Sequence, residues 1–384
     1  MKKRKIIHFS LANTKSGVTQ YVLNNWKHID KEKFQFDVVT FGGKLDFQEE
    51  LEKEGCEIFY VKSRAEDNLE EFRNEISQIF LNGYDAVHLH TSYWKSFELE
   101  KLASQAGIPR IIVHSHNTAV FDDDGREEKE KQYFLLREQL TSDIATDFWA
   151  CSQMAAAWLY ADKIPRNKIR IMYNAIDVPR FTFDGDKRQE IRRRLGWENN
   201  LVIGHVGRFS YQKNHIFLIE IFKEIAKKNE EARLVLIGKG PLEEEIKALT
   251  EKYNLTDKVH FAGTCDDVHC WLAAMDIFVL PSRFEGLGMA VIEAQACGVK
   301  CLVSDTVPKE AAVTDNISFL PLDTSIWVQE ILSEKRNEKN RRQYAEQVIR
   351  AGYDINTYIK TLEYLYDFED GDASDTSGEE RLLT

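Results

Sequence analysis

Cysteine and proline are scarce in this chain, and long apolar runs are missing. Its 384 residues include 6 cysteines and 7 prolines. No two cysteines form a CxxC pair, so the spacing excludes the common zinc motifs and a disulfide-stapled secreted scaffold. No apolar stretch approaches the length of about 18 residues that a membrane span needs. We therefore expect reduced, mostly buried thiols and a cytoplasmic protein that does not cross a bilayer.

An excess of basic residues is also lacking. The chain carries 51 Lys and Arg against 63 Asp and Glu, a net charge of −12. Residues 367–384 hold seven acidic side chains and one Arg, which is half of that excess. A mildly acidic body argues against a nucleic-acid partner, which a basic face would attract. The start of the chain, MKKRKIIHF, lacks the apolar stretch and cleavage site of a signal peptide.

The residues that are present alternate between β-rich runs and helical patterns. Apolar residues make up 43% of the chain, enough for two sizeable cores. Strands that alternate with helices predict βαβ units and mostly parallel sheets. The expected strands are 5–11, 36–41, 57–61, 86–90, 110–116, 148–151, 169–177, 201–207, 232–238, 259–263, 276–282 and 300–305. The pattern breaks at 178–200 and then restarts, which predicts two α/β sheets in tandem.

The segment 276–298, DIFVLPSRFEGLGMAVIEAQACG, is the most informative one. A buried strand leads into a glycine-containing loop and then a helix that is expected to begin near Met289. Gly286 and Gly288 allow a ligand close to the backbone, so the N–H groups of Leu287 to Met289 form a candidate phosphate cradle. Glu285 and Glu293 flank the cradle and suit hydroxyl-bearing groups. The plainer alternative is that Glu293 is a solvated helix residue.

The segment 206–214, VGRFSYQKN, also follows a buried strand. Gly207 opens the loop, and Arg208 and Lys213 stand five residues apart within it. An Arg fork and a Lys point charge at this place can neutralise a diphosphate. The alternative is an ordinary solvated loop.

Together these segments resemble the retaining glycosyltransferases of family 4, which have the GT-B fold. The resemblance rests on the GR…QKN loop and the EGLGMAVIE segment, and it extends to LVLIGKGPLEEEIKAL and VHFAGTCDDVHCWLAAMDIFVLPS. It covers roughly residues 5–305 and is more specific than any single motif. Within the family the chain looks most like bacterial exopolysaccharide or capsular-polysaccharide glycosyltransferases. The implied fold is α/β, with two Rossmann-like domains that face each other across a cleft.

The resemblance implies transfer of a sugar from a nucleotide sugar, with a UDP-sugar as the expected donor, to an acceptor hydroxyl. Arg208 and Lys213 would hold the diphosphate and stabilise the departing nucleotide. Glu285 would hydrogen-bond hydroxyls of the donor sugar, and Glu293 those of the ribose. Two cations and a helix N-terminus can stabilise the leaving group, so no metal or other cofactor is expected.

On the N-terminal side, the resemblance places Gly17 where a loop approaches the donor and His116 beside the donor sugar. Ser16, Gly17 and Val18 stand where many family members have two adjacent glycines and an acidic residue, which leaves the role of the loop open. His114 and His116 share one side of the expected strand. We choose His116 because it lies nearest the end of the strand.

Three further features are weaker candidates. His88 and His90 repeat the same pattern at another strand end and are candidates to line the acceptor cleft. The acidic run 122–124 resembles a site for Mg²⁺ or Mn²⁺, but its polar surroundings favour a solvated loop. The pairs Cys265/Cys270 and Cys297/Cys301 lack zinc spacing and are interpreted as structural thiols.

The resemblance also implies how the chain is divided into domains. We expect an N-terminal acceptor-side domain at 1–180, a nucleotide-sugar domain at 181–339, helices at 340–368 that pack back on the N-terminal domain, and a disordered acidic tail at 369–384. The expected acceptor is a carbohydrate or a lipid-linked sugar. The basic helix at 187–197 and the N-terminal KKRK are candidates for peripheral contact with the cytoplasmic membrane face.

Two other functions remain open at this point. A nucleotide-sugar epimerase of the same fold would bind the same donor but would need no acceptor. A non-catalytic relative would bind a nucleotide or a partner, although retention of Arg208, Lys213, Glu285 and Glu293 together argues against degeneration.

Overall fold

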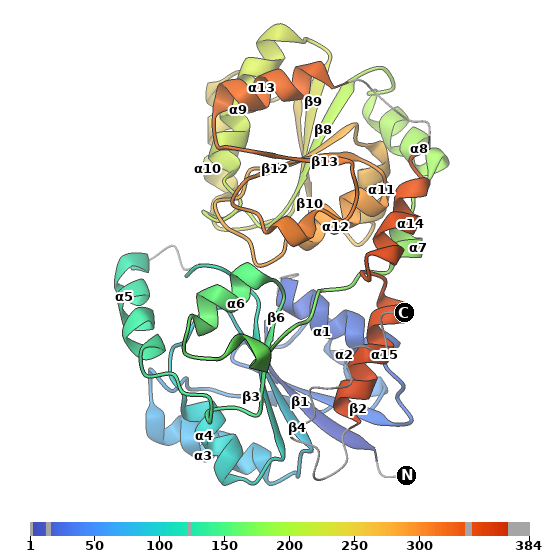
Figure 1. Ribbon diagram of the computed structural model, residues 1–384. Helices are drawn as coiled ribbons and strands as arrows, with labels where there is room; N and C mark the ends of the chain where they lie inside the picture. The colour runs from blue at the N-terminus through green and yellow to red at the C-terminus, as the bar shows by residue number, and fades with distance from the viewer. Residues whose placement is uncertain (1–2, 13–16, 121–124, 335–339, 368–384) are drawn as a thin grey trace.

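The computed structural model describes residues 3–12, 17–120, 125–334 and 340–367. Two parallel sheets, each covered by helices, lie one above the other in Figure 1. This arrangement confirms the two α/β sheets that the alternating sequence pattern predicts. Among the helices of the described residues, none has the length and apolar character that crossing a bilayer requires.

The N-terminal sheet has seven strands in the order β3-β2-β1-β4-β5-β6-β7, all parallel. The strand order reverses between β1 and β4, and such switch points are where ligands bind in open α/β sheets. The strands are β1 (Arg4–Leu11), β2 (Phe34–Thr40), β3 (Ile58–Tyr60), β4 (Ala86–Thr91), β5 (Arg110–Ser115), β6 (Asp147–Ala150) and β7 (Ile169–Ile171). The helices of this half are α1 (Gly17–His28), α2 (Gln48–Lys53), α3 (Leu69–Phe80), α4 (Glu98–Gln105), α5 (Arg126–Arg137) and α6 (Gln153–Tyr160).

The C-terminal sheet repeats this design with six strands in the order β10-β9-β8-β11-β12-β13. Its switch point lies between β8 and β11. The strands are β8 (Leu201–Val206), β9 (Ala232–Ile237), β10 (Val259–Gly263), β11 (Ile277–Leu280), β12 (Lys300–Ser304) and β13 (Ile317–Leu320). The helices are α9 (His215–Lys228), α10 (Glu243–Lys252), α11 (Val268–Ala274), α12 (Met289–Ala296) and α13 (Thr324–Ser333). The sequence pattern does not predict β13 or α13.

The connection between the sheets contains α7 (Val178–Phe181) and α8 (Gly185–Leu195), the latter the basic helix of the sequence. Arg188 and Arg192 on this helix are 4% exposed. Each donates from Nη2 to one carboxylate oxygen of Asp276, at 2.6 Å. The interpretation of this whole helix as a cationic membrane-facing surface is therefore wrong for these two residues, which lie inside the protein because they neutralise a buried carboxylate.

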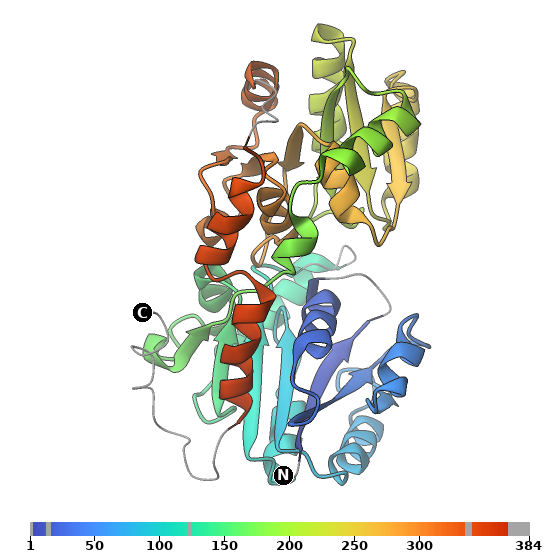
Figure 2. The same cartoon turned by 90° about the vertical axis from the view of Figure 1, so that its right-hand side faces the viewer.

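Two helices follow the second sheet, α14 (Gln343–Arg350) and α15 (Ile355–Tyr366). Figure 2 shows α15 beside the strands of the N-terminal sheet, although it comes last in the described sequence. Its apolar face, which includes Tyr358, Leu362 and Tyr366, is buried in one cluster with residues of β1, β2 and α1. The hydroxyls of Tyr21 and Tyr358 are 2.8 Å apart. This helix therefore contributes to the core on one face of the N-terminal sheet.

Candidate active site

The carboxyl ends of β8 and β11 position the two loops that the sequence singles out. These neighbouring strands flank the switch point of the C-terminal sheet, so their following loops diverge from one edge. The backbone N–H of Arg283 donates to the carbonyl of Gln212 at 2.8 Å, which ties the loops together. Segments that are about 70 residues apart in the chain thus become one site.

Lys213 and Glu285 form the charged centre of this site. Lys213 Nζ lies 2.6 Å from Oε1 of Glu285, and the Glu285 residue is 4% exposed. The Ser282 hydroxyl donates to the same oxygen at 2.6 Å, and Gln212 Nε2 lies 3.3 Å from Oε2. Sequence reasoning did not identify Ser282 or Gln212, although both stand within four residues of a predicted site residue. Their bonds hold the carboxylate in one orientation before any ligand arrives.

The backbone at the start of α12 has the features of the predicted cradle. Gly288 is the N-cap residue with φ +89°, and no side chain caps the helix. The N–H groups of Met289 and Ala290 therefore receive no cap from the side chain of this residue, and Leu287 is buried beside them. Free N–H groups at a helix start favour an anion. The arrangement can accept a phosphate oxygen next to Lys213.

The loop after β8 packs closely and leaves one cation exposed. A Cβ on Gly207 would lie 2.8 Å from Nε2 of His205 and 3.1 Å from the Lys213 side chain, so glycine makes room for the lysine. Gly238, at φ +136°, approaches the Gly207 carbonyl in the same way. Arg208 is exposed, and its guanidinium has no hydrogen-bond or ion-pair partner within the described parts of the chain. It is available to a ligand from solvent.

Glu293 lies on α12, one turn into the helix, and is half-buried. Burial raises the pKa of its carboxyl to about 7, against the opposing effects of Arg180 and Lys213. A fully solvated helix residue would not show such a shift, so the plainer interpretation of Glu293 does not describe this site. A carboxyl group that is partly protonated near neutral pH can donate as well as accept hydrogen bonds.

The N-terminal sheet meets this site through residues that follow β5 and β6. Thr118 Oγ1 donates to the backbone carbonyl of Glu285 at 3.0 Å, and Ser152 Oγ donates to that of Gly286 at 2.6 Å. A Cβ on Gly286 would lie 2.0 Å from the backbone oxygen of His116. The carboxyl edges of the two sheets therefore touch at Gly286, where only glycine fits.

The predicted histidines divide into two groups. His116 follows β5 and is half-buried at this contact, and burial lowers its pKa to about 3. His114 and His88 are fully buried, and burial lowers the pKa of each well below its usual value. The expectation that His88 lines an acceptor cleft is therefore wrong, because its strand position lies inside the core. His90, two residues nearer the strand end, is half-buried.

Gly17 begins α1 and is exposed, and a Cβ there would meet nothing within 4 Å. Its expected approach to the donor stays a prediction. Ser16 and the acidic run 122–124 lie outside the described residues, as does the tail 369–384. The six cysteines are free and five of them are buried, in line with structural thiols.

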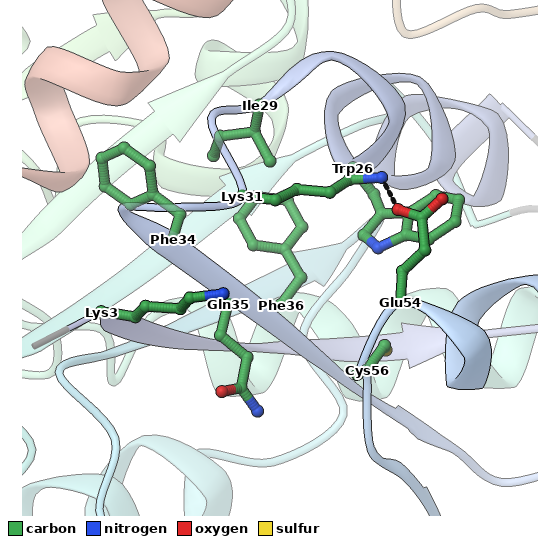
Figure 3. Close-up of a pocket in the computed structure, with 10 residues that line it drawn as sticks. Lys3, Trp26, Ile29, Lys31, Phe34, Gln35, Phe36, Glu54 and Cys56 are labelled. Carbon is green, nitrogen blue, oxygen red and sulfur yellow. Dashed lines mark ion pairs between the residues drawn. The ribbon is translucent and has the colours of Figure 1, made fainter.

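A cavity of about 100 Å³ lies away from these residues, in the N-terminal half. Figure 3 shows Trp26, Phe34 and Phe36 on its walls, with the Lys31–Glu54 ion pair at its rim. Phe34 is the first residue of β2, so the cavity opens at the amino end of this strand. Ligand sites in open α/β sheets lie at the opposite, carboxyl ends. We assign this cavity no part in the chemistry.

Comparison with known protein families agrees with this geometry. Residues 187–348 match the family described as Glycosyl transferases group 1, and residues 16–175 match the Glycosyl transferase 4-like domain. The chain is 31% identical over 373 residues to EpsF of Bacillus subtilis strain 168, which is named as a glycosyltransferase. This match covers 95% of the chain and 96% of EpsF.

A second relative is the Escherichia coli UDP-Gal:alpha-D-GlcNAc-diphosphoundecaprenol alpha-1,3-galactosyltransferase. It is 28% identical over 323 residues, which is 79% of this chain and 80% of that enzyme. Among solved structures, Anabaena HepE in complex with UDP and glucose has a TM-score of 0.75 at 16% identity and covers 94% of this chain and 99% of its own. WaaG, a glycosyltransferase of lipopolysaccharide biosynthesis, has a TM-score of 0.69 at 15% identity and covers 95% and 100%. These similarities confirm the GT-B fold.

Proposed function

The chain belongs to the group 1 glycosyltransferase family, and on that basis we propose that it is a retaining enzyme that moves a sugar from a UDP-sugar to an acceptor hydroxyl. The observation that carries the proposal is the Lys213–Glu285 pair together with the start of α12, where the N-cap Gly288 supplies no side-chain cap. A relative that uses UDP-Gal and a solved neighbour bound to UDP support UDP as the nucleotide.

The site residues have separable roles in this proposal. Lys213 and Arg208 bind the diphosphate, and the first N–H groups of α12 donate hydrogen bonds to its oxygens. Glu285 accepts hydrogen bonds from hydroxyls of the donor sugar, in the orientation that Ser282 holds. Lys213 can keep its bond to Glu285 while it binds the diphosphate, because an ammonium group has three donors. No metal is needed to stabilise the leaving group in this arrangement.

The proposed transfer retains the configuration at C1, and its proton balance needs no strong base. The bond from the sugar C1 to the diphosphate breaks, and the acceptor oxygen forms its bond to C1 on the same face. The acceptor proton passes to the departing diphosphate oxygen. His116, with a pKa of about 3, is too weak a base near pH 7 to take that proton. Its role is therefore to hydrogen-bond the donor sugar.

The proposed acceptor is a lipid-linked or growing polysaccharide in exopolysaccharide or capsule biosynthesis. The diphosphoundecaprenol acceptor in the name of the Escherichia coli relative supports this class. Such an acceptor would bring the enzyme to the cytoplasmic membrane face as a peripheral protein. Co-sedimentation with vesicles that contain undecaprenyl-linked sugar tests this part separately.

The first experiment is a thermal-shift screen in EDTA against UDP, GDP, ADP and their common sugar conjugates. A ligand at about 100 times its Kd stabilises the folded state by about 2.7 kcal/mol. We expect one UDP-sugar to raise the Tm in EDTA. A response to another nucleotide would overturn the donor assignment, and no response would favour a non-catalytic relative.

The second experiment follows product with the donor identified in the screen. Transfer with retention releases UDP and gives an anomeric configuration that NMR identifies as that of the donor. An epimerase would interconvert sugars without any acceptor. Glu285→Ala should abolish most transfer, and unchanged transfer in this variant would show that the site is assigned wrongly.

A further inference from the structure

Histidines are concentrated on three neighbouring strands of the N-terminal sheet. His8 on β1 is paired in register with His88 on β4, and His90 on β4 is paired with His114 on β5. His116 follows β5 directly, and its ring centroid is 4.0 Å from that of His114. Since the spacing within each strand is two residues, all five rings lie on one face of the sheet. They form a layer that ends at the contact between the two sheets.

Hydrogen bonds orient these rings. His8 Nδ1 lies 3.0 Å from His90 Nε2, and His88 Nε2 lies 3.2 Å from His114 Nδ1. These contacts occupy Nε2 of His90 and Nδ1 of His114 and fix the orientation of both rings. Nδ1 of His90 faces Nε2 of His116 at 2.9 Å. Nε2 of His114 is buried and has no hydrogen-bond partner within the described residues.

We propose that His90, His114 and His116 form a binding site for one transition-metal ion of the zinc class. One ligand nitrogen from each ring lies within 4.8 Å of the others. Zinc–nitrogen bonds of about 2.0–2.1 Å place two ligand nitrogens about 3.3 Å apart, so only small ring movements are needed. Three imidazoles that leave one coordination position open are a recurring zinc-binding set.

The surroundings favour His90, His114 and His116 as the metal ligands over a second set of three nearby histidines. His8 and His88 supply the outer hydrogen bonds that fix the orientation of metal-binding imidazoles in proteins. The alternative set of His8, His88 and His90 also has closely spaced nitrogens, but two of its members are fully buried. His90 and His116 are half-buried, whereas His8 and His88 are fully buried, so the first set is the more accessible to an ion.

The ion would exclude the donor sugar rather than assist transfer. This part rests on the proposed function, which places His116 beside that sugar. Nε2 of His116 already faces His90, so its buried Nδ1, which has no partner within the described residues, is the nitrogen left for a hydroxyl. Once Nε2 binds the metal, Nδ1 carries the ring proton and can no longer accept a hydrogen bond from the sugar. We therefore expect Zn²⁺ to weaken binding of the UDP-sugar while leaving binding of UDP unchanged, and EDTA to reverse the effect.

Metal binding is tested on the full chain after treatment with EDTA and its removal. Titration with Zn²⁺ by calorimetry, and with Co²⁺ by visible absorption, should give one ion per chain and the spectrum of a four-coordinate ion with three nitrogen ligands. His90→Gln and His114→Gln should weaken binding roughly a hundredfold. His260→Gln, a half-buried histidine on β10, is the matched control and should bind as the unmodified chain does.

If His114→Gln fails to fold, His116→Asn at the end of the strand and the Co²⁺ spectrum of the unmodified chain still decide the question. Absence of a nitrogen-ligated Co²⁺ spectrum, or equal affinity in the trio variants and His260→Gln, would overturn the site. Trio-dependent binding without competition against the UDP-sugar would overturn the exclusion of the donor. Failure of the proposed function is separate, because it appears as a lack of UDP-sugar binding or transfer in EDTA.

Discussion

At the carboxyl edge of the C-terminal sheet, Lys213 and Glu285 form an ion pair, whereas the same edge of the N-terminal sheet presents His90 and His116 as half-buried rings. Both edges follow from the same topology, with a reversal of strand order near the middle of the sheet. The topology therefore places a binding edge in each half. In the proposed function, the side chains of one edge stabilise a diphosphate and those of the other contact an uncharged sugar.

The largest effect on activity is expected from a change at the carboxyl edge of the C-terminal sheet, where Lys213 and Glu285 form their ion pair. In the proposed function Lys213 stabilises the departing diphosphate, so for Lys213→Ala we expect kcat/KM to fall by about 10²–10³. Initial rates of UDP release with acceptor present give the measurement. Lys247→Ala, at a half-buried ion-paired residue on α10, is the matched control and should retain full activity. Equal activity of Lys213→Ala and Lys247→Ala would contradict the role of the ion pair.

The next effect concerns the point at which the edges touch. Gly286→Ala places a Cβ 2.0 Å from the backbone oxygen of His116, so the two halves must separate. We expect kcat/KM to fall by roughly a hundredfold, because a misplacement of about 1 Å is costly in a preorganised site. Gly43→Ala, where a Cβ meets nothing within 4 Å, serves as the control. Equal activity of the two variants would show that this contact is not needed for transfer.

A smaller effect, on donor affinity, is expected from a change at the carboxyl edge of the N-terminal sheet, where His116 lies. His116→Ala removes one hydrogen bond to the donor sugar, worth about 1 kcal/mol. We expect affinity for the UDP-sugar to fall about fivefold and affinity for UDP to stay the same. Calorimetric titration of both ligands measures the split. A parallel loss for UDP would place His116 near the nucleotide instead.

The smallest effect is one of pH on stability. The folded state raises the pKa of Glu293 from 4.5 to about 7, so it binds this proton more tightly than the unfolded chain does. Its contribution to stability is complete below pH 4.5 and is lost as the pH rises toward 7 and above. Glu293→Gln should therefore stabilise the ligand-free protein at pH 8 and have little effect at pH 4.5. Denaturant unfolding at both pH values tests this; equal effects would contradict the shifted pKa.

Much of the fold could be predicted because buried parallel strands leave a strong pattern. The runs at 201–207 and 276–282 have the apolar character that burial on both faces requires, and they became β8 and β11. The segment 317–320 did not stand out, because β13 is only half-buried at the edge of its sheet. The prediction of membrane contact for the basic helix at 187–197 was wrong for Arg188 and Arg192 for a different reason. The charges in a sequence do not reveal a buried carboxylate partner such as Asp276.

The sequence by itself determined the two α/β halves, the glycine-bearing loops after β8 and β11 and the residue types at the site, because periodicity and turn chemistry are local properties. Only the tertiary structure decided that Ser282 and Gln212 hold Glu285, that Gly286 touches His116, and that histidines from β1, β4 and β5 share one layer. Those contacts join residues that are far apart in the chain or depend on loop geometry. They are set by strand order and register, which no single segment encodes.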